Sequence, residues 1–549
     1  MGFKALEGHP ATCCDGFTCM DDDAFFSTCV LASAAHKDMG SSVPQTTLEN
    51  KVLPAGEVFN YEEAIYLSNL FFEAQRAGVL PVEGRRIPWR GDSFVDDKGQ
   101  GGEDLSGGYF DGAMGGSLIK FGLPAAWSTT VLAWGALEYA DAYEVAGETD
   151  HLLSTLRWGL DYFIKAHAAP DELYVQVGDQ KDLGFWSPPE MSLPTQRNAY
   201  KVTCENPGTE PAAETAAAMA AGSMVFRDRD PVYAELLLSH AKQLHDFAGR
   251  CKGNYVVEGG IREATPFYRS QGYEDELAWS ALFLYKATMD KAYLTQAQEL
   301  YPTCCSAVGR AGALPPVAIK RSAGTGSGGG VDGEIFSVDV AAFSYDDKAG
   351  GVQLLLHNLT GEAKYATDAT AFLDSWLAKP RTPQGLAYLP AAPPLPAAAA
   401  TSFLALMAAD QGLKPEEYRR FARNQIHYIL GYERDTDKPQ KQHQQQQQGN
   451  SPPTTGHQSF VIGFGTTYPK APAHRASSCQ FQRSNASCHC SAAPAAYRLY
   501  GALVAGPGPD DRWADSCDDF EGNAVSLAGN AGFQSAVAGL KHLSMRQQQ

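Results

Sequence analysis

The pattern that decides the fold first appears at Tyr61-Glu-Glu-Ala-Ile65-Tyr-Leu67-Ser-Asn-Leu70-Phe71, where apolar residues recur at intervals of three and four. The same spacing returns at 128–137, 214–219 and 275–283, with Gly/Pro-rich connections between the stretches. This periodicity is typical of amphipathic helices, and strand-like alternation is scarce. The sequence therefore predicts an all-α domain, with helical hairpins stacked around a common axis or in layers.

Composition limits the class of partner. The chain has 549 residues, 44% of them hydrophobic, and a formal net charge of -19. Nucleic acid and anionic membranes attract basic proteins, so neither is an expected partner, and a neutral ligand fits better. No long uncharged apolar run is present, and the first residues lack the apolar region of a secretory signal. Either the protein is cytosolic or its true N-terminus is missing.

The cysteines favour export. Four of the twelve cysteines fall within the first 29 residues, in a stretch too short to fold by burial alone, where disulfides are normally needed. Cys479, Cys488 and Cys490 match no standard zinc spacing, so we read them as disulfide or loop cysteines and expect no metal. We divide the chain into a cysteine-rich segment at 1–34, a linker at 35–56, the helical domain at 57–542 and a tail at 543–549.

Ordered motifs along the helical domain carry a family resemblance. They include Trp89-Arg-Gly-Asp92-Ser93, Gly107-Gly-Tyr-Phe-Asp111, Trp186-Ser-Pro-Pro-Glu190, Tyr428-Ile-Leu-Gly431 and the segment from Trp513 to Asn530. In order and spacing the chain resembles the glycoside hydrolase family 9 endoglucanases. The resemblance implies an (α/α)6 barrel with long loops, an open cleft for β-1,4-glucan, a monomer, and inverting hydrolysis by two carboxyl groups.

Inversion needs an acid and a base. One protonated carboxyl protonates the leaving oxygen, while a carboxylate roughly 6.5–9.5 Å away activates water on the opposite face of the sugar. The resemblance places the helping aspartate at Asp111 and the main base at Met114, in a loop about three residues longer than in the family. A longer glycine-rich loop could also swing Asp111 into the base position.

The acid position is substituted as well. Without a gap from Trp513 to Asn530, the family pattern puts active-site aspartates at Asp515 and Asp519 and its proton-donating glutamate at Ala524. A methyl group carries no proton, and Glu521 could substitute only if the backbone changed register. We therefore predict catalytic residues Asp111, Asp515 and Asp519 in a cleft with impaired hydrolysis.

Other positions of the predicted cleft also depart from the family. Ala392, Pro396 and Ala397 stand where the resemblance implies a Trp, an Arg or Gln, and a Tyr, so sugar stacking is expected to be lost there. Cys517 replaces an arginine, and Ala528-Gly529 replaces an Asp-Tyr pair.

Several candidates for substrate binding have ordinary structural interpretations beside them. Trp186 and Trp279 could stack on glucose rings, or they could be core residues. His474 and Arg475 could contact sugar hydroxyls, or the histidine could be structural. Asp275-Glu276 opens a predicted helix, where carboxylates complement the helix dipole; calcium binding is the less favoured interpretation, and we expect no cofactor.

The first 34 residues resemble the C-terminal half of a family 1 carbohydrate-binding module, in Thr12-Cys13-Cys14-Asp-Gly16-Phe-Thr18-Cys19 and the following Phe25-Phe26-Ser27-Thr-Cys29. The resemblance implies that Phe25 and Phe26 contact cellulose, and a disordered tail is the alternative. For the whole chain three hypotheses stay open: an endoglucanase with relocated acid and base, a non-catalytic glucan-binding protein, and an intracellular interaction scaffold.

Overall fold

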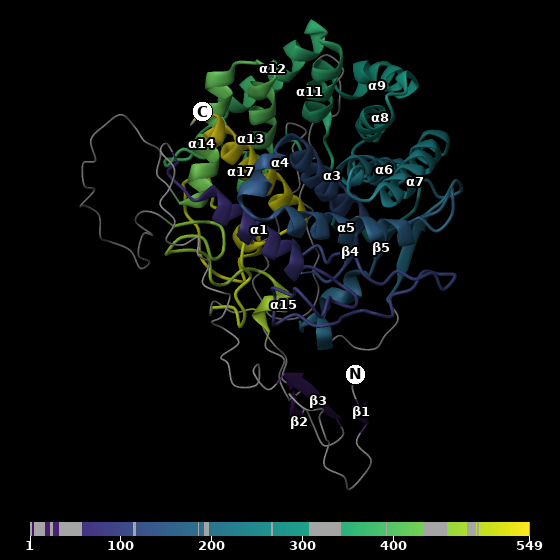
Figure 1. Cartoon of the computed structure of the whole chain (residues 1–549), viewed down its shortest axis with the longest axis vertical. Helices are drawn as coiled ribbons and strands as arrows, with labels where there is room; N and C mark the ends of the chain where they lie inside the picture. The colour runs from purple at the N-terminus through teal and green to yellow at the C-terminus, as the bar shows by residue number, and fades with distance from the viewer. Residues whose placement is uncertain are drawn as a thin grey trace, which may run out of the picture.

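The computed structural model describes residues 57–113, 117–184, 186–191, 197–264, 267–306, 342–390, 392–431, 458–479, 490 and 494–547. It also describes the backbone of three short strands near the N-terminus, β1 (Phe3–Lys4), β2 (Phe17–Asp21) and β3 (Phe26–Leu31), which pair antiparallel in the order β1-β3-β2. The remainder is mostly helical (Figure 1).

Among the described residues, six helices close a ring by packing against their neighbours in the order α3, α6, α8, α11, α13, α17 and back to α3. Helix α17 is therefore the element that joins the end of the domain to its beginning. The bounds of the ring are α3 (Gly122–Glu138), α6 (Thr209–Phe226), α8 (Glu274–Thr288), α11 (Ala349–Thr360), α13 (Pro394–Asp410) and α17 (Leu527–Gln547).

An outer helix covers each member of this ring. In the order of the ring these outer helices are α5 (Thr149–Ala166), α7 (Pro231–Arg250), α9 (Lys291–Cys304), α12 (Ala363–Leu377), α14 (Pro415–Leu430) and α1 (Tyr61–Ala74). Two concentric sets of six are the (α/α)6 barrel, so the predicted fold is confirmed.

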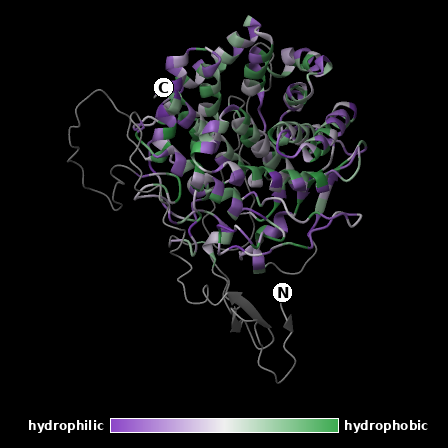
Figure 2. Cartoon of the chain, viewed as in Figure 1, coloured by the Kyte–Doolittle hydropathy of each residue, from purple (hydrophilic) through white to green (hydrophobic). Residues whose placement is uncertain are grey.

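The two rings differ in composition. Inner helices such as α6 and α13 are buried on nearly every side, whereas outer helices such as α7 and α14 bury one face and expose the other. Figure 2 shows the hydrophilic residues gathered on the peripheral helices. Small residues allow the inner helices to approach closely: a Cβ added to Gly532 of α17 would lie 2.9 Å from Ala400 of α13.

Connections complete the domain. They include α4 (Ala140–Val145), α15 (Arg475–Ser478), α16 (Phe520–Asn523), the short helices η1 (Gln180–Gly184), η2 (Pro189–Met191) and η3 (Arg262–Ala264), and an antiparallel sheet of β4 (Lys120–Phe121), β5 (Leu173–Val177) and β6 (Ala199–Val202). Helix α17 continues past the predicted boundary at 542 as far as Gln547, and Ser544 is buried and donates a hydrogen bond to Glu57.

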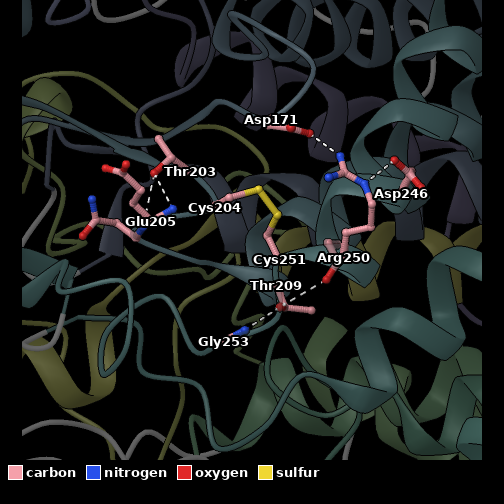
Figure 3. The surroundings of a disulfide bond; sticks show 11 residues. Asp171, Thr203, Cys204, Glu205, Thr209, Asp246, Arg250, Cys251 and Gly253 are labelled. Atoms are coloured by element: carbon pink, nitrogen blue, oxygen red, sulfur yellow. Dashed lines mark hydrogen bonds and ion pairs between the residues drawn. A yellow bond between two sulfur atoms is a disulfide. The ribbon is translucent and has the colours of Figure 1, made fainter.

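Disulfide bonds link some of the segments that connect the helices. Cys204, just after β6, is bonded to Cys251 at the end of α7, next to the ion pair of Arg250 with Asp171 (Figure 3). The described residues contain two further disulfides, Cys304–Cys305 and Cys490–Cys517. Cys479 is disulfide-bonded as well, so the disulfide interpretation of Cys479 and Cys490 is confirmed.

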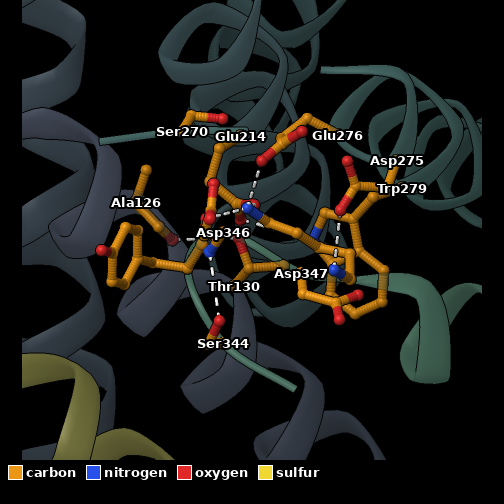
Figure 4. Close-up of polar contacts among 12 residues, drawn as sticks. Ala126, Thr130, Glu214, Ser270, Asp275, Glu276, Trp279, Ser344, Asp346 and Asp347 are labelled. Atoms are coloured by element: carbon orange, nitrogen blue, oxygen red, sulfur yellow. Dashed lines mark hydrogen bonds and ion pairs between the residues drawn. The ribbon is translucent and has the colours of Figure 1, made fainter. Parts of the chain in front are cut away.

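A buried ion cluster ties α6, α8 and α11 together (Figure 4). The ammonium of Lys348 lies 2.6 Å from Glu276 and 3.4 Å from Glu214, and all three side chains are 0% exposed. Trp279 donates its indole N–H to Glu214 at 3.3 Å. Trp279 is itself 0% exposed, so the ring packs in the barrel core and does not form a wall for sugar stacking.

Candidate active site

A cavity lies at the N-terminal ends of inner helices. Its lining comes from the first turns of α13 and α17, from Trp127 early in α3, from the segment that leads into α11, and from the loop that contains α16. It measures about 150 Å³. Because the N-terminal ends of the inner helices meet at this mouth, residues far apart in the sequence face one space.

Ala524 lines this cavity. A methyl group therefore faces the cavity at the position where the family resemblance places the proton-donating glutamate. The residue follows α16, a single helical turn capped by Asp519, whose carboxylate accepts the N–H of Gly522 at 3.1 Å. Glu521 lies within that turn and lines the same cavity. Among the described lining residues Glu521 is the only one with a carboxyl group.

Asp111 lies beside the same space. Its backbone oxygen accepts the N–H of Leu527 at 3.3 Å, and a Cβ added to Gly112 would lie 3.4 Å from the backbone oxygen of Val525, so the Asp111 segment runs against the segment after Ala524. The side chain is 1% exposed. One carboxylate oxygen accepts the hydroxyl of Tyr268 at 2.6 Å, and the other has no hydrogen-bond partner among the described residues.

Burial changes the acidity of Asp111. Desolvation raises the pKa of the Asp111 carboxyl to about 6, against a weaker lowering by the hydrogen bond from Tyr268. Near neutral pH this group therefore titrates between a neutral acid and a carboxylate. Sequence reasoning missed Tyr268, since nothing local to Asp111 indicates a partner 157 residues away.

The carboxylates of Asp515 and Asp519 hold the loop in place through hydrogen bonds to backbone N–H groups. The two oxygens of Asp515 accept the backbone N–H groups of Lys470 and Ala471, both at 2.8 Å. Asp519 caps α16. Neither residue is among the residues that line the cavity, and both carboxylates accept backbone N–H groups, so a catalytic role for Asp515 or Asp519 stays a prediction.

A glycosyl hydrolase family 9 model matches residues 61–436 and 450–537. The chain belongs to this family. Endoglucanase B of Cellulomonas fimi is 38% identical over 498 residues, covering 88% of this chain and 42% of that protein, so the chain spans less than half of that relative.

The structure of an endoglucanase from the termite Nasutitermes takasagoensis has 38% identity and a TM-score of 0.74, covering 89% of this chain and 100% of the other. The cellulase Cel9M of C. cellulolyticum, solved in complex with cellobiose, has 28% identity and a TM-score of 0.71, with 88% and 98% coverage.

In this family 9 chain the predicted histidine and arginine are buried. His474 is 2% exposed and bonds to Ser477 at 3.0 Å and Gln75 at 3.1 Å. Burial lowers the pKa of His474 to about 3, so the ring stays neutral. Arg475 donates to the backbone oxygens of Asp182 and Leu183. The hydrogen bonds of both side chains go to other groups of the protein, which favours a structural role for His474 and Arg475 over contact with sugar hydroxyls.

Trp186 is half-buried and lies under Arg475, with the guanidinium 5.3 Å from the ring centroid. One face of the indole is therefore covered by the protein, and the ring does not line the cavity around Ala524. Its role in substrate binding stays a prediction.

Asp275 and Glu276 occupy the first turn of α8. Asp275 accepts the backbone N–H of Lys348 at 2.8 Å, and Glu276 pairs with the ammonium of the same residue. Across the described residues, no three histidine, cysteine or acidic side chains gather as a metal site would require. The calcium interpretation thus gains no support, since a lysine occupies the position facing these carboxylates.

The remaining predicted residues lie outside the described part. Met114 falls in the gap at 114–116, and the side chains of Phe25 and Phe26 are not among the described ones. Conversely, Ala392, Pro396 and Ala397, where sugar contacts were expected to be lost, all line the cavity. Four aromatic residues of the lining were not predicted from the sequence, namely Trp127, Phe267, Phe343 and Tyr345.

Proposed function

We propose that this chain is an endoglucanase-class protein that binds β-1,4-glucan and hydrolyses it weakly. Family membership and the endoglucanase relatives support the class of activity. The cellobiose complex of Cel9M supports a β-1,4-linked glucose ligand. Nothing in the net charge of -19 opposes a neutral polysaccharide.

The observation that carries the impaired hydrolysis is the methyl of Ala524 on the cavity wall. A general acid contributes roughly 10²- to 10⁴-fold to such a reaction, and a methyl group has no proton to give. Asp111 adds to the argument, because its carboxyl is shielded from solvent and held by Tyr268. A base must accept a proton from water in contact with the sugar.

One observation favours a second function, that of a hydrolase with a relocated acid. Glu521 lines the same cavity as Ala524, one helical turn earlier. Its carboxyl group could protonate a leaving oxygen if the glucan lay over α16. Under this alternative Glu521 is the donor, and Glu521→Gln abolishes turnover.

One assay separates the two functions. Hydrolysis of cellopentaose is compared for the wild type, Ala524→Glu, Glu521→Gln and the control Ala514→Glu, which adds a carboxylate on an exposed alanine of the same loop outside the cavity lining. We expect slow turnover that rises at least about 100-fold in Ala524→Glu only. Rapid wild-type turnover lost in Glu521→Gln contradicts impaired hydrolysis and establishes the relocated acid.

Glucan binding is measured apart from turnover, by calorimetric titration of the wild type with cellotetraose. Saturable binding supports the proposal, and its absence favours the interaction-scaffold hypothesis. We further propose that the protein is exported, on the basis of the disulfides of the described residues, and that it is a monomer, as the family resemblance implies. Within those residues no helix has the length and apolar character needed to span a membrane. Cell fractionation tests whether the protein is exported, and sedimentation tests whether it is a monomer.

A further inference from the structure

A second cavity of the described residues lies apart from the one around Ala524. Its lining comes from 462–472 and 494–499, two segments joined by a hydrogen bond from the N–H of Ala495 to the backbone oxygen of Lys470 at 2.7 Å. It measures about 130 Å³, and the described lining residues of the two cavities do not overlap. We call it the Arg498 pocket, after the cation in its lining, and the proposed hydrolysis gives it no role.

The walls of the Arg498 pocket include several flat apolar rings. The pyrrolidine rings are those of Pro469, Pro472 and Pro494, and the aromatic rings are those of Tyr468 and Tyr497. Trp89 stacks on Tyr497 with ring centroids 5.3 Å apart and an interplanar angle of 2°. Because Trp89 covers one face of Tyr497, the ring is held in place and presents its other face or its edge to the pocket. Surfaces of this kind suit the flat C–H face of a pyranose ring.

Arg498 places a positive charge beside these rings. Its guanidinium carbon lies 5.5 Å from the ring centroid of Tyr468 and 5.3 Å from that of Tyr500, and one N–H donates to the Tyr500 hydroxyl at 2.9 Å. The described lining contains a second cation, Lys470, and no acidic residue. The whole chain has 44 basic and 63 acidic residues, so the local charge of this pocket is opposite to that of the protein.

The charges near the pocket favour an anionic ligand. Asp515 touches the backbone behind Lys470, but its two oxygens accept the N–H groups of Lys470 and Ala471, both at 2.8 Å, which offset part of its charge. The net charge of -19 is spread over the molecule, and salt screens charges beyond about 8 Å at physiological ionic strength. Nearby cations therefore decide, and a guanidinium matches the two oxygens of a carboxylate.

We propose that the Arg498 pocket binds an acidic saccharide through one uronate ring. The carboxylate pairs with the guanidinium of Arg498, and the C–H face of the ring lies against the tyrosine and proline rings. The inference goes beyond the proposed function, which concerns a neutral glucan, and it does not depend on turnover. Such a site would attach the protein to an acidic polysaccharide while the cavity around Ala524 stays open to glucan.

The test compares methyl glucuronide with methyl glucoside, two sugars that differ only at carbon 6. Binding to the full chain is followed by ligand-observed NMR and calorimetry at neutral pH. We expect saturable binding of the glucuronide and at least tenfold weaker binding of the glucoside. Arg498→Met should weaken glucuronide binding at least tenfold, and Lys470→Met at least threefold. The control is Arg512→Met, which removes the same charge from a side chain that is 90% exposed and outside the lining.

Circular dichroism establishes which variants are folded, and Lys470→Met keeps the test available if Arg498→Met fails to fold. The proposal is overturned by the absence of glucuronide binding, by equal binding of the two sugars, or by unchanged binding in the folded variants. Equal weakening by Arg512→Met also overturns it, because overall charge would then be the cause. Displacement by an equal concentration of sulfate would indicate a site for any anion, and displacement by cellotetraose a site in the glucan cleft; either result contradicts the proposal. Cellotetraose titrated alone reports on the proposed function, so either can fail without the other.

Discussion

Replacing Asp111 by Asn is expected to stabilise the protein at neutral pH. The carboxyl is 1% exposed, and only one of its oxygens has hydrogen-bond partners among the described residues. Burial raises its pKa from 3.8 to about 6, so the folded protein holds this proton more tightly than the unfolded chain does. Stability from the group is therefore fully present below pH 4 and is lost as the pH rises through about 6.

The magnitude follows from the two pKa values. Each pKa unit corresponds to about 1.36 kcal/mol, so ionising Asp111 in the folded state costs about 3 kcal/mol at pH 7.5. An asparagine is always neutral and still offers an oxygen to the hydroxyl of Tyr268. Asp111→Asn should therefore be about 3 kcal/mol more stable than the wild type at pH 7.5, and less than about 1 kcal/mol more stable at pH 4.

Urea unfolding followed by circular dichroism measures both differences. The control is Asp150→Asn, because the Asp150 side chain is 92% exposed and its replacement should change stability by less than about 0.5 kcal/mol at either pH. The reasoning is refuted if Asp111→Asn is less stable than the wild type at pH 7.5. It is also refuted if the difference between the two proteins is the same at pH 4 and pH 7.5.

Three further predictions concern the scaffold. Lys348→Met leaves buried carboxylates without their cation and should lower the free energy of unfolding by about 3–5 kcal/mol at pH 7, whereas Lys414→Met, at an ion pair 46% and 39% exposed, should change it by about 0–1 kcal/mol. Removing the Cys204–Cys251 disulfide by a double alanine substitution should cost about 2–4 kcal/mol in urea unfolding, and an unchanged midpoint contradicts this. The His474 ring, with a pKa of about 3, should show no NMR titration between pH 8 and pH 4, and a midpoint near 6.5 contradicts its burial.

Local periodicity predicted the helices, but not the order in which they close the ring. The spacing of apolar residues in α5 identifies one buried face, which includes Leu152, Leu156 and Phe163. Helix α13 has no polar face, because nearly every residue of Pro394–Asp410 is buried, so its pattern cannot orient it. Closure depends on contacts such as that of Gly532 with Ala400, which join residues 132 apart and leave no local signal.

Trp279 illustrates the same limit at a single residue. A tryptophan on a helix fits either a core or a sugar-binding wall. Its burial is decided by Glu214, which accepts the indole N–H, and by Gly351, where an added Cβ would lie 2.6 Å from the ring. Both partners come from other helices, so only the assembled barrel assigns Trp279 to the core.

The place of Ala524 in the loop was predictable because short-range hydrogen bonds hold the turn before it. Asp519 caps the turn before it, and the side chain of Asn523 donates to the backbone oxygen of Ala514 at 2.7 Å, all within ten residues. The partner of Asp111 was not, because Tyr268 belongs to a distant connection.

Hydrogen bonds to backbone N–H groups explain why the carboxylates of Asp515 and Asp519 are weak evidence for turnover in this chain. Asp515 binds two backbone N–H groups, and Asp519 caps a helical turn, so both stabilise the loop whatever residue stands at position 524. Replacing either one would disturb the loop with or without catalysis. The acid position itself makes no such bond through its side chain, and a methyl group there leaves the loop intact. The shape of the cavity and the presence of its proton donor are therefore separable, and the residue at the donor position bears more directly on turnover than the carboxylates that hold the loop.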